Sequence, residues 1–256
     1  MSLSKEKKVL LQAANSAGKV MLKYFGRNQD VEKKFNKSLV SKADLEANKV
    51  IIQTIKKNFP AHNIFSEETG FEDNDSDYKW VIDPIDGTHN FLRGIPIFGV
   101  SIALEHRDEV VLGVLHFPVL KLTASAEKGK GAFLNGKRLK VSSNSDLSYS
   151  FILYEFVSAT RHKSIEFLKR IAHETLDIRN FGSAIYELIL VASGQCDAYV
   201  IFSTNEWDIA AGMLLIQEAG GKITDLKGND CNPSEGSFIM SNGKIHGSLL
   251  RYLHGI

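Results

Sequence analysis

The stretch of sequence that decides the fold is Trp80-Val81-Ile82-Asp83-Pro84-Ile85-Asp86-Gly87-Thr88-His89-Asn90-Phe91. It begins as an apolar run typical of a buried strand and then delivers two aspartates, three residues apart, into a tight turn. Pro84 fixes φ and Gly87 permits a positive φ, so we expect Thr88 to cap a short helix. The turn would offer carboxylates, the Ile85 carbonyl, a hydroxyl and helix-start N–H groups, which suit a hard cation bridged to a phosphate. An ordinary Asx-type turn also fits this spacing, so the segment alone does not decide the function.

The composition is that of an ordinary globular protein, with 43% hydrophobic and 24% charged residues in 256. A formal charge of +1 gives no electrostatic reason to expect a nucleic-acid or membrane-surface partner. The start of the chain is polar, and no segment is a membrane-length apolar run, so we expect a cytoplasmic protein. Two scattered cysteines and eight histidines without ligand spacing argue against a disulfide framework and against zinc.

The first half of the chain, residues 1–141, predicts helices followed by antiparallel strands. Apolar residues at steps of three and four predict a helix over 10–25 that ends at Gly26, and a second helix is expected over about 43–58. The polar stretch 27–37 between them is expected to be loop or edge strand. Asn135-Gly136 predicts a two-residue hairpin turn. Apolar or alternating runs predict strands at 64–66, 80–82, 100–104, 110–117 and 122–126, with hairpin arms at 132–134 and 138–139.

The second half, residues 142–256, alternates strands with helices and therefore predicts a layered α/β arrangement. The Ser-rich stretch 142–148 is the only candidate boundary, and we expect residues 1–256 to form one unit of two joined halves. The fold class is thus α/β, with an α+β first half. The expected strands are 151–156, 177–181, 197–202, 222–225 and 238–241, and the expected helices are 164–173, 183–193, 209–219 and 245–254.

Three further segments carry polar groups that could join the aspartates of the turn. Phe65-Ser66-Glu67-Glu68-Thr69-Gly70 ends an apolar run with two acids, and Glu206-Trp207-Asp208-Ile209-Ala210-Ala211-Gly212 opens a helix. Phe181-Gly182-Ser183-Ala184 joins a strand to a helix and can show backbone N–H groups to an anion. Taken singly, these segments fit a solvated loop, an N-cap aspartate and an ordinary helix start.

Together, in this order and at these separations, the segments resemble the inositol monophosphatase family of magnesium-dependent, lithium-sensitive phosphatases. The resemblance spans nearly the whole chain, from the first helix to Ser241-Asn242-Gly243. It implies alternating α-β-α-β-α layers of the sugar phosphatase type and a homodimer. It also implies hydrolysis of a small phosphomonoester, an inositol monophosphate or a sugar phosphate, to free alcohol and phosphate.

The resemblance also implies a set of ligands for two or three Mg²⁺ ions. Glu67, Asp83 and the Ile85 carbonyl would hold the first, catalytic ion. Asp83, Asp86 and Asp208 would hold the second, and Glu67 would contribute to a third, more weakly held one.

Further residues match catalytic and substrate-binding positions of the family. Thr88 matches the hydroxyl that orients the attacking water, and Asp44 matches the acid that polarises this threonine, so Thr88, Asp44 and Glu67 are the implied catalytic residues. Gly87 and Thr88 would supply backbone donors to the phosphate, and Gly182-Ser183-Ala184 and Asp208 would lie on the substrate side.

The chemistry explains why such a set of ligands is needed. Phosphate monoesters hydrolyse extremely slowly, so an enzyme must neutralise the phosphate oxygens, orient a water in line and stabilise the leaving alkoxide. Two metal ions about 3.5 to 4 Å apart can serve all three needs. No Cys or Ser with a paired base stands out in the sequence, so we expect direct attack by water without a phosphoenzyme.

Three places depart from the family pattern, one of them His89, which stands where a second threonine is common. The run Ser38-Leu39-Val40-Ser41 stands where Asp-Leu-Val-Thr is usual, near a basic loop with Lys33 and Lys34 that could cover the site. Ile201 stands where inositol-hydrolysing members carry a glutamate that accepts hydrogen bonds from ring hydroxyls. An isoleucine cannot accept, so we expect an apolar pocket wall and a specificity not centred on inositol.

Other functions remain open at this stage. Within the superfamily the substrate could be fructose 1,6-bisphosphate, a 3'-phosphoadenosine nucleotide, histidinol phosphate or NADP. The turn reads Thr88-His89-Asn90-Phe91 and not Thr-Lys-Glu-Phe, which disfavours the nucleotide. A regulatory binding protein that keeps the fold without turnover is the alternative from another class.

Overall fold

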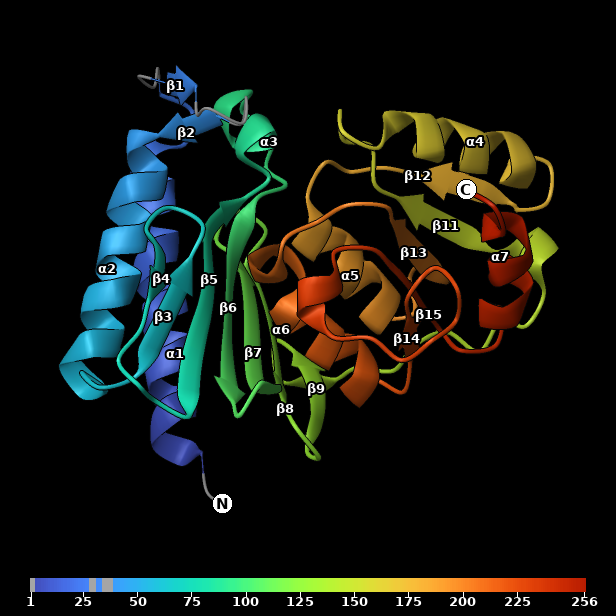
Figure 1. Cartoon of the computed structure of the whole chain (residues 1–256). Coiled ribbons are helices and arrows are strands. Elements are labelled where there is room, and N and C mark those ends of the chain that lie inside the picture. Colours follow the sequence, from blue (N-terminus) through green and yellow to red (C-terminus); the bar gives the residue numbers. More distant parts are fainter. Residues whose placement is uncertain (1–2, 28–30, 34–38) are drawn as a thin grey trace.

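Five layers of alternating helices and sheets make up the protein (Figure 1). The computed structural model describes residues 3–27, 31–33 and 39–256. In order across the molecule the layers are α1 and α2, an 8-stranded sheet, α5 and α6, a 5-stranded sheet, and α4 with α7. The predicted fold class and layer order are confirmed.

The outer helix layer consists of α1 (Ser4–Tyr24) and α2 (Lys42–Asn58), which were both predicted. Their apolar faces are buried together with residues of the 8-stranded sheet in one hydrophobic cluster. Between them, β1 (Val31–Lys33) pairs with β2 (Leu39–Ser41), so the edge-strand prediction is confirmed for residues 31–33. The remainder of that prediction, including Lys34, lies outside the described residues.

The 8-stranded sheet has the order β10-β9-β8-β7-β6-β5-β3-β4. Its predicted strands are confirmed, but β4 was not predicted, and β3 pairs with β5 in parallel, unlike the expected antiparallel pattern. The hairpin at Asn135-Gly136 is confirmed, with φ of 48° and 80°. The strands are β3 (Asn63–Ser66), β4 (Gly70–Glu72), β5 (Tyr78–Asp86), β6 (Gly99–His106), β7 (Glu109–Phe117), β8 (Leu122–Glu127), β9 (Gly131–Leu134) and β10 (Lys137–Arg138).

The 5-stranded sheet has the order β12-β11-β13-β15-β14, in which β11 runs parallel to β12 and β13. All predicted elements of the second half are confirmed, with ends shifted by a few residues. The strands are β11 (Phe151–Tyr154), β12 (Asp177–Arg179), β13 (Ala198–Ile201), β14 (Lys222–Thr224) and β15 (Phe238–Ser241). The helices are α4 (Arg161–Ile171), α5 (Ala184–Ala192), α6 (Glu206–Glu218) and α7 (His246–Leu253), with short 3₁₀ turns at Leu147–Tyr149 and Pro233–Glu235.

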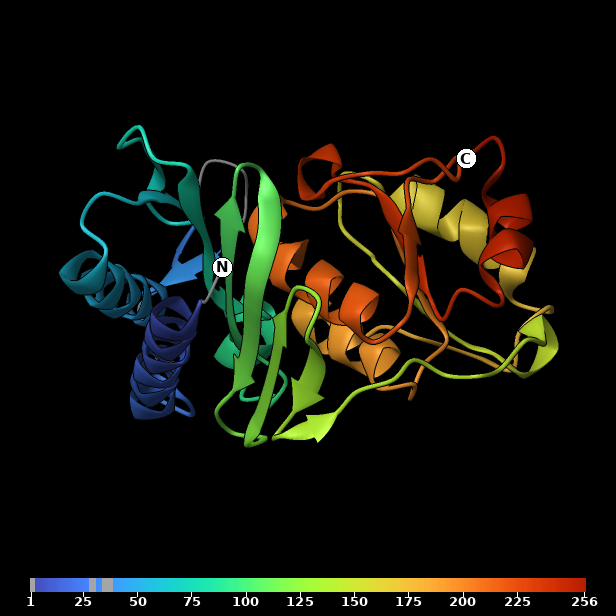
Figure 2. The same cartoon turned by 90° about the horizontal axis from the view of Figure 1, so that it is seen from below.

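Helices α5 and α6 lie side by side between the two sheets, as the view from below shows (Figure 2). A Cβ at Gly113 of β7 would lie 2.9 Å from the Ala211 carbonyl oxygen, so glycine is what lets α6 approach the sheet this closely. The cluster around these helices joins residues of both sheets, such as Leu115 of β7 and Leu153 of β11, to residues of the helices, such as Leu215 of α6. None of the helices in the described ranges is long and apolar enough to span a membrane.

We predict that the chain unfolds in a single transition, because this shared core joins the two expected halves. Urea unfolding should give the same midpoint by far-UV circular dichroism, which reports on both sheets, and by fluorescence of Trp80 and Trp207. Two separated midpoints would show that residues 1–141 and 142–256 are independent units.

Candidate metal centre

Strand β5 ends in an irregularity that turns two aspartates to one side. Asp83 pairs with Ser101 of β6 and Asp86 pairs with Gly99, so β5 carries one more residue than its partner between these points. In a regular strand, residues three apart face opposite sides of the sheet, and a bulge removes this alternation. The extra residue therefore lets Asp83 and Asp86 face the same space.

The chain reverses at Gly87, which has φ of 79° and precedes α3 (Thr88–Leu92). A Cβ there would lie 2.8 Å from the carbonyl oxygen of Ile97. Glycine is thus required both by the torsion and by the contact. The prediction that Thr88 caps this helix is wrong by one residue: Gly87 is the N-cap, and the Thr88 hydroxyl donates to the Ile85 carbonyl at 3.0 Å.

A third carboxylate reaches the same space from the second half. Oxygens of Asp83, Asp86 and Asp208 all lie within 4.8 Å of one another. Asp208 is not the N-cap of α6, which is Asn205, but the third residue of the helix. Its Oδ2 accepts from the Asn205 N–H and the Thr204 hydroxyl, both at 3.0 Å, and these two bonds fix the direction of the carboxylate.

The loop between β12 and α5 holds Asp86. The Ser183 hydroxyl donates to Asp86 Oδ2, and the Ala184 N–H donates to Oδ1 at 3.2 Å. Gly182, with φ of 70°, precedes them. In this structure the loop contacts the Asp86 carboxylate, and its expected contact with a substrate anion stays a prediction.

The three carboxylates lie in surroundings that oppose their ionisation. Burial, followed by the charges of Glu67, Asp86 and Asp208, raises the pKa of Asp83 well above its ordinary value. Burial also raises the pKa of Asp86 to about 7 and that of Asp208 to about 6. No ion pair among the described residues includes any of the three.

These surroundings fit a bound cation. Like charges this close need an opposite charge to stay ionised, and oxygen donors suit a hard divalent ion. Ser101, which pairs with Asp83 across the sheet, is buried, and its hydroxyl is the one buried side-chain polar atom of the described residues without a hydrogen-bond partner. An unsatisfied hydroxyl beside the carboxylates fits a site that is completed by a bound group.

Glu67 and Asp44 lie next to this group of three. Glu67 directly follows β3, and its N–H donates to the Ile82 carbonyl at 3.1 Å, which fixes it against the end of β5. Its charge acts on both Asp83 and Asp208. Asp44 is buried, accepts from the N–H and hydroxyl of Ser41, and has its pKa raised to about 6, first by burial. The described contacts include no Asp44–Thr88 hydrogen bond, so the expected pair is not formed here.

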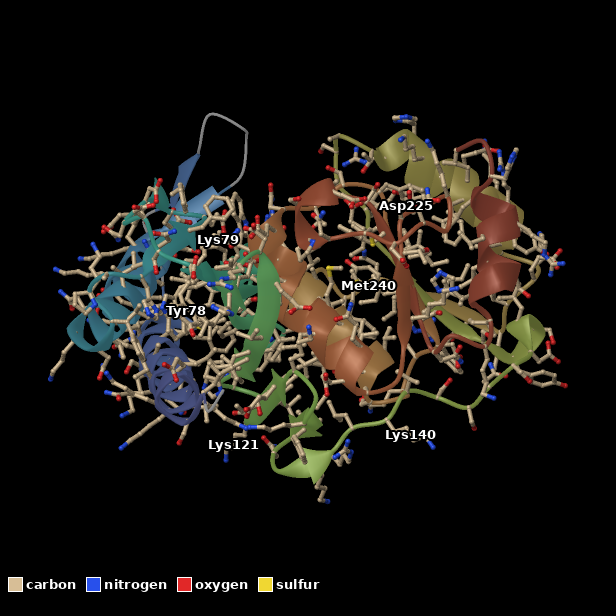
Figure 3. All side chains as sticks on the ribbon, turned by 60° about the horizontal axis from the view of Figure 1, so that its bottom comes forward. Tyr78, Lys79, Lys121, Lys140, Asp225 and Met240 are labelled. Carbon is tan, nitrogen blue, oxygen red and sulfur yellow. The ribbon has the colours of Figure 1, made fainter. Side chains whose placement is uncertain are left out.

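Lys79 is a structural residue that sequence reasoning missed. Its Nζ lies 2.8 Å from Glu105 of β6 and 2.8 Å from Glu206, the first residue of α6. Lys79 is found where the strands of the first half meet α6 (Figure 3). The bridge joins residues 127 apart in the chain, so no local pattern could have indicated it. It ties the start of the helix that carries Asp208 to the strand that carries Asp83.

The expectation that Ile201 forms a pocket wall is wrong, whereas the expected specificity stays a prediction. The Ile201 side chain is 0% exposed and packs in the hydrophobic cluster between the sheets, so it presents no wall to a ligand. Strand alternation turned this residue inward, and counting along the sequence could not reveal that. The chain still has no side chain at this position that could accept a hydrogen bond from a substrate hydroxyl.

Comparison with known proteins identifies the family. The model of the inositol monophosphatase family matches residues 2–256. The chain belongs to the inositol monophosphatase family. Family membership confirms that it is a phosphomonoesterase, and the aspartate group described above could hold the metal for such a reaction.

Relatives in this family carry more than one name. A Thermotoga maritima protein named fructose-1,6-bisphosphatase/inositol-1-monophosphatase is 39% identical over 250 residues, which cover 96% of this chain and 94% of the relative. A Pseudomonas aeruginosa protein named Nus factor SuhB is 35% identical over 252 residues, covering 94% and 93%. The crystal structure of the extragenic suppressor protein suhB from Bartonella henselae has a TM-score of 0.95 at 35% identity, covering 99% of this chain and 100% of that one.

We predict that Gly87→Ala destabilises the protein more than Gly94→Ala does. Both glycines have φ above 70°, but a Cβ at Gly94 meets nothing within 4 Å, whereas at Gly87 it meets the Ile97 carbonyl. The shared torsion cost is about 1 to 2 kcal/mol, and the clash should add about 1 to 3 kcal/mol at Gly87 alone. Free energies of unfolding from urea titrations measure the difference, and equal losses would contradict the close approach.

Proposed function

We propose that this phosphomonoesterase holds two or three Mg²⁺ ions and hydrolyses an inositol monophosphate or a sugar phosphate to free alcohol and phosphate. The observation that carries the proposal is the convergence of three carboxylates within 4.8 Å, those of the buried Asp83 and Asp86 and the half-buried Asp208. In proteins, Mg²⁺ is commonly bound through one or two carboxylates together with substrate phosphate oxygens.

We assign the ligands as follows. Glu67, Asp83 and the Ile85 carbonyl hold the first ion, Asp83, Asp86 and Asp208 hold the second, and Glu67 contributes to a third. The position of Glu67 beside the end of β5 supports its role, because its charge already acts on Asp83 and Asp208.

Bound Mg²⁺ would neutralise the phosphate oxygens, make water a stronger nucleophile and stabilise the leaving alkoxide. The protein orients the reactants. Thr88 positions the attacking water with its hydroxyl, which must turn from the Ile85 carbonyl toward Asp44 to be polarised by that carboxylate. The N–H groups of Gly87 and Thr88 donate to the phosphate, and Gly182-Ser183-Ala184 closes the substrate side while it holds Asp86.

The second part of the proposal concerns the alcohol that the preferred phosphomonoester carries. The Thermotoga maritima relative is named for both fructose 1,6-bisphosphate and inositol 1-phosphate, which supports fructose-1,6-bisphosphatase activity as a second candidate. Relatives named Nus factor SuhB support a regulatory role as the alternative from another class, and that role is compatible with catalysis.

Release of phosphate from about ten phosphomonoesters, with and without magnesium, separates these functions. Light scattering tests the homodimer that the family resemblance implies.

We predict that Asp83→Asn lowers turnover on the order of 10³-fold, because this carboxylate serves two metal sites and its loss removes a principal electrostatic stabiliser. Asp108→Asn, a matched change at an exposed residue of the β6–β7 turn, should leave turnover unchanged. Steady-state phosphate release in excess Mg²⁺ is the measurement. Equal wild-type rates with magnesium and with excess chelator would show that the reaction does not use the proposed ions.

We predict that stabilisation by Mg²⁺ grows with pH. The folded-state pKa values of about 7 for Asp86 and about 6 for Asp208 lie above the ordinary value of 3.8, so the bound protons stabilise the metal-free fold at low pH, and this stability is lost as pH rises from 3.8 through the folded-state values. Mg²⁺ binds the ionised form. A hundredfold excess over the dissociation constant contributes about 2.7 kcal/mol, or about 5 to 10 °C in Tm at pH 8.

The same concentration of Mg²⁺ should raise Tm much less at pH 5.5, because protonated carboxyl groups bind the ion more weakly. Differential scanning fluorimetry at both pH values, with NaCl at equal ionic strength as the control, measures the shift. A shift that is larger at pH 5.5 would contradict the carboxylate site.

A further inference from the structure

Glu187 of α5 is a buried carboxyl group to which the metal centre assigns no role. Its side chain is 1% exposed, and none of the ion pairs of the described residues includes it. Burial raises its pKa to about 8, so the group is largely protonated at neutral pH. A buried carboxyl without a cationic partner costs stability. Its hydrogen bonds must offset this cost.

Those hydrogen bonds go to one loop and one strand. Glu187 Oε1 accepts from the Phe181 N–H at 2.6 Å, and the next N–H of the loop, that of Gly182, donates to Asn180 Oδ1 at 3.1 Å. The hydroxyl of the fully buried Tyr199, on β13, donates to the Glu187 carboxyl as well. One carboxyl therefore joins the Phe181 N–H of the β12–α5 loop to Tyr199 of β13.

Asn90 of α3 holds the same loop from the other side. Its Nδ2 donates to the Phe181 carbonyl at 2.8 Å and to the Gly182 carbonyl at 3.3 Å. The Phe181 N–H thus faces Glu187, and the carbonyls of Phe181 and Gly182 face Asn90. Side chains therefore fix the peptide groups on both sides of Phe181, in a segment that belongs to neither helix nor strand.

The next two residues of the loop are the ones that contact Asp86. The Ser183 hydroxyl and the Ala184 N–H each bind one oxygen of its carboxylate. A shift of Phe181 and Gly182 would move these donors and turn the carboxylate. Partners that hydrogen-bond to a metal ligand typically set metal affinity by a factor of about 10 to 100.

We propose that Glu187 is a positioning residue of the metal centre: it holds residues 181–184 so that Ser183 and Ala184 fix the direction of Asp86, and it thereby sets the affinity for Mg²⁺. This inference rests on the proposed metal function of Asp86. It assigns to a residue outside the aspartate group a role in ion binding that is distinct from stabilising the fold.

The test uses Glu187→Leu and Glu187→Gln, with the apparent Mg²⁺ dissociation constant taken from the rise in Tm during a titration without substrate. Leucine has a similar volume and no acceptor, so the constant should rise about tenfold. Glutamine keeps an acceptor for the Phe181 N–H and resembles the protonated acid, so its constant should stay within about twofold of wild type.

Ile171→Ala is the control for general destabilisation. Ile171 is buried in α4, in a hydrophobic cluster that excludes residues 181–187. This variant should lower Tm without magnesium and leave the Mg²⁺ constant unchanged. The same rise in Ile171→Ala as in Glu187→Leu would overturn the positioning role, because loss of stability alone would then explain it.

Tyr199→Phe keeps the test decisive if Glu187→Leu does not fold. It removes one hydroxyl from the Glu187 carboxyl and should raise the Mg²⁺ constant by about two- to threefold, about the effect of a weakened neutral hydrogen bond. A wild-type protein that responds to Mg²⁺ while Glu187→Leu, or Tyr199→Phe in its place, binds it equally well would overturn the positioning role alone. A wild-type protein that does not respond at all would overturn the proposed metal function as well.

Discussion

Mutual repulsion between Asp83, Asp86 and Asp208 is the constraint on which the rest of the structure depends. Two unit charges 4.8 Å apart repel by about 3.5 kcal/mol at an effective dielectric constant of about 20. The site contains three such pairs. Nothing in the described contacts of these carboxylates neutralises them, so the fold must hold them together without a metal and leave the repulsion for a cation to relieve.

The scaffold meets this constraint by using helix starts. Asp44 and Asp208 are each the third residue of a helix and the second half of a capping box, so each carboxylate accepts an N–H of the residue that precedes its helix. The start of a helix also carries partial positive charge, which favours an anion there. Two acids of the site therefore stabilise the fold locally, while Asp83 and Asp86 depend on the bulge and on Ser183.

Much of this arrangement could be predicted from the sequence, because its signals are local. Periodicity indicates α1 and α2, and Asn135-Gly136 indicates its hairpin, since each depends only on nearby residues. The bulge in β5, the Lys79–Glu206 bridge and the burial of Ile201 depend on partners far along the chain. The roles of Thr88 and Asp44 came from resemblance, and their hydroxyl and carboxylate have other partners in this structure.

The site takes its residues from both halves of the chain. This division explains why relatives with different names can share the fold. Most of the groups proposed to bind the metal ions and the phosphate follow β3 or lie at the end of β5. The loops that follow β11, β12 and β13 form the opposite, substrate side of the site. Parallel strands place ligands at their carboxyl ends. There, Glu155 accepts from the Phe202 and Ser203 N–H groups and fixes the chain that leads to Asp208. Ile201 of β13 is buried, so this strand side chain does not line the substrate side, whereas Ser203 in the loop that follows is exposed. Exposed side chains of these loops can change while the backbone and Ser183 contacts that hold Asp86 and Asp208 are kept, so substrate preference can diverge while the hydrolytic chemistry is kept.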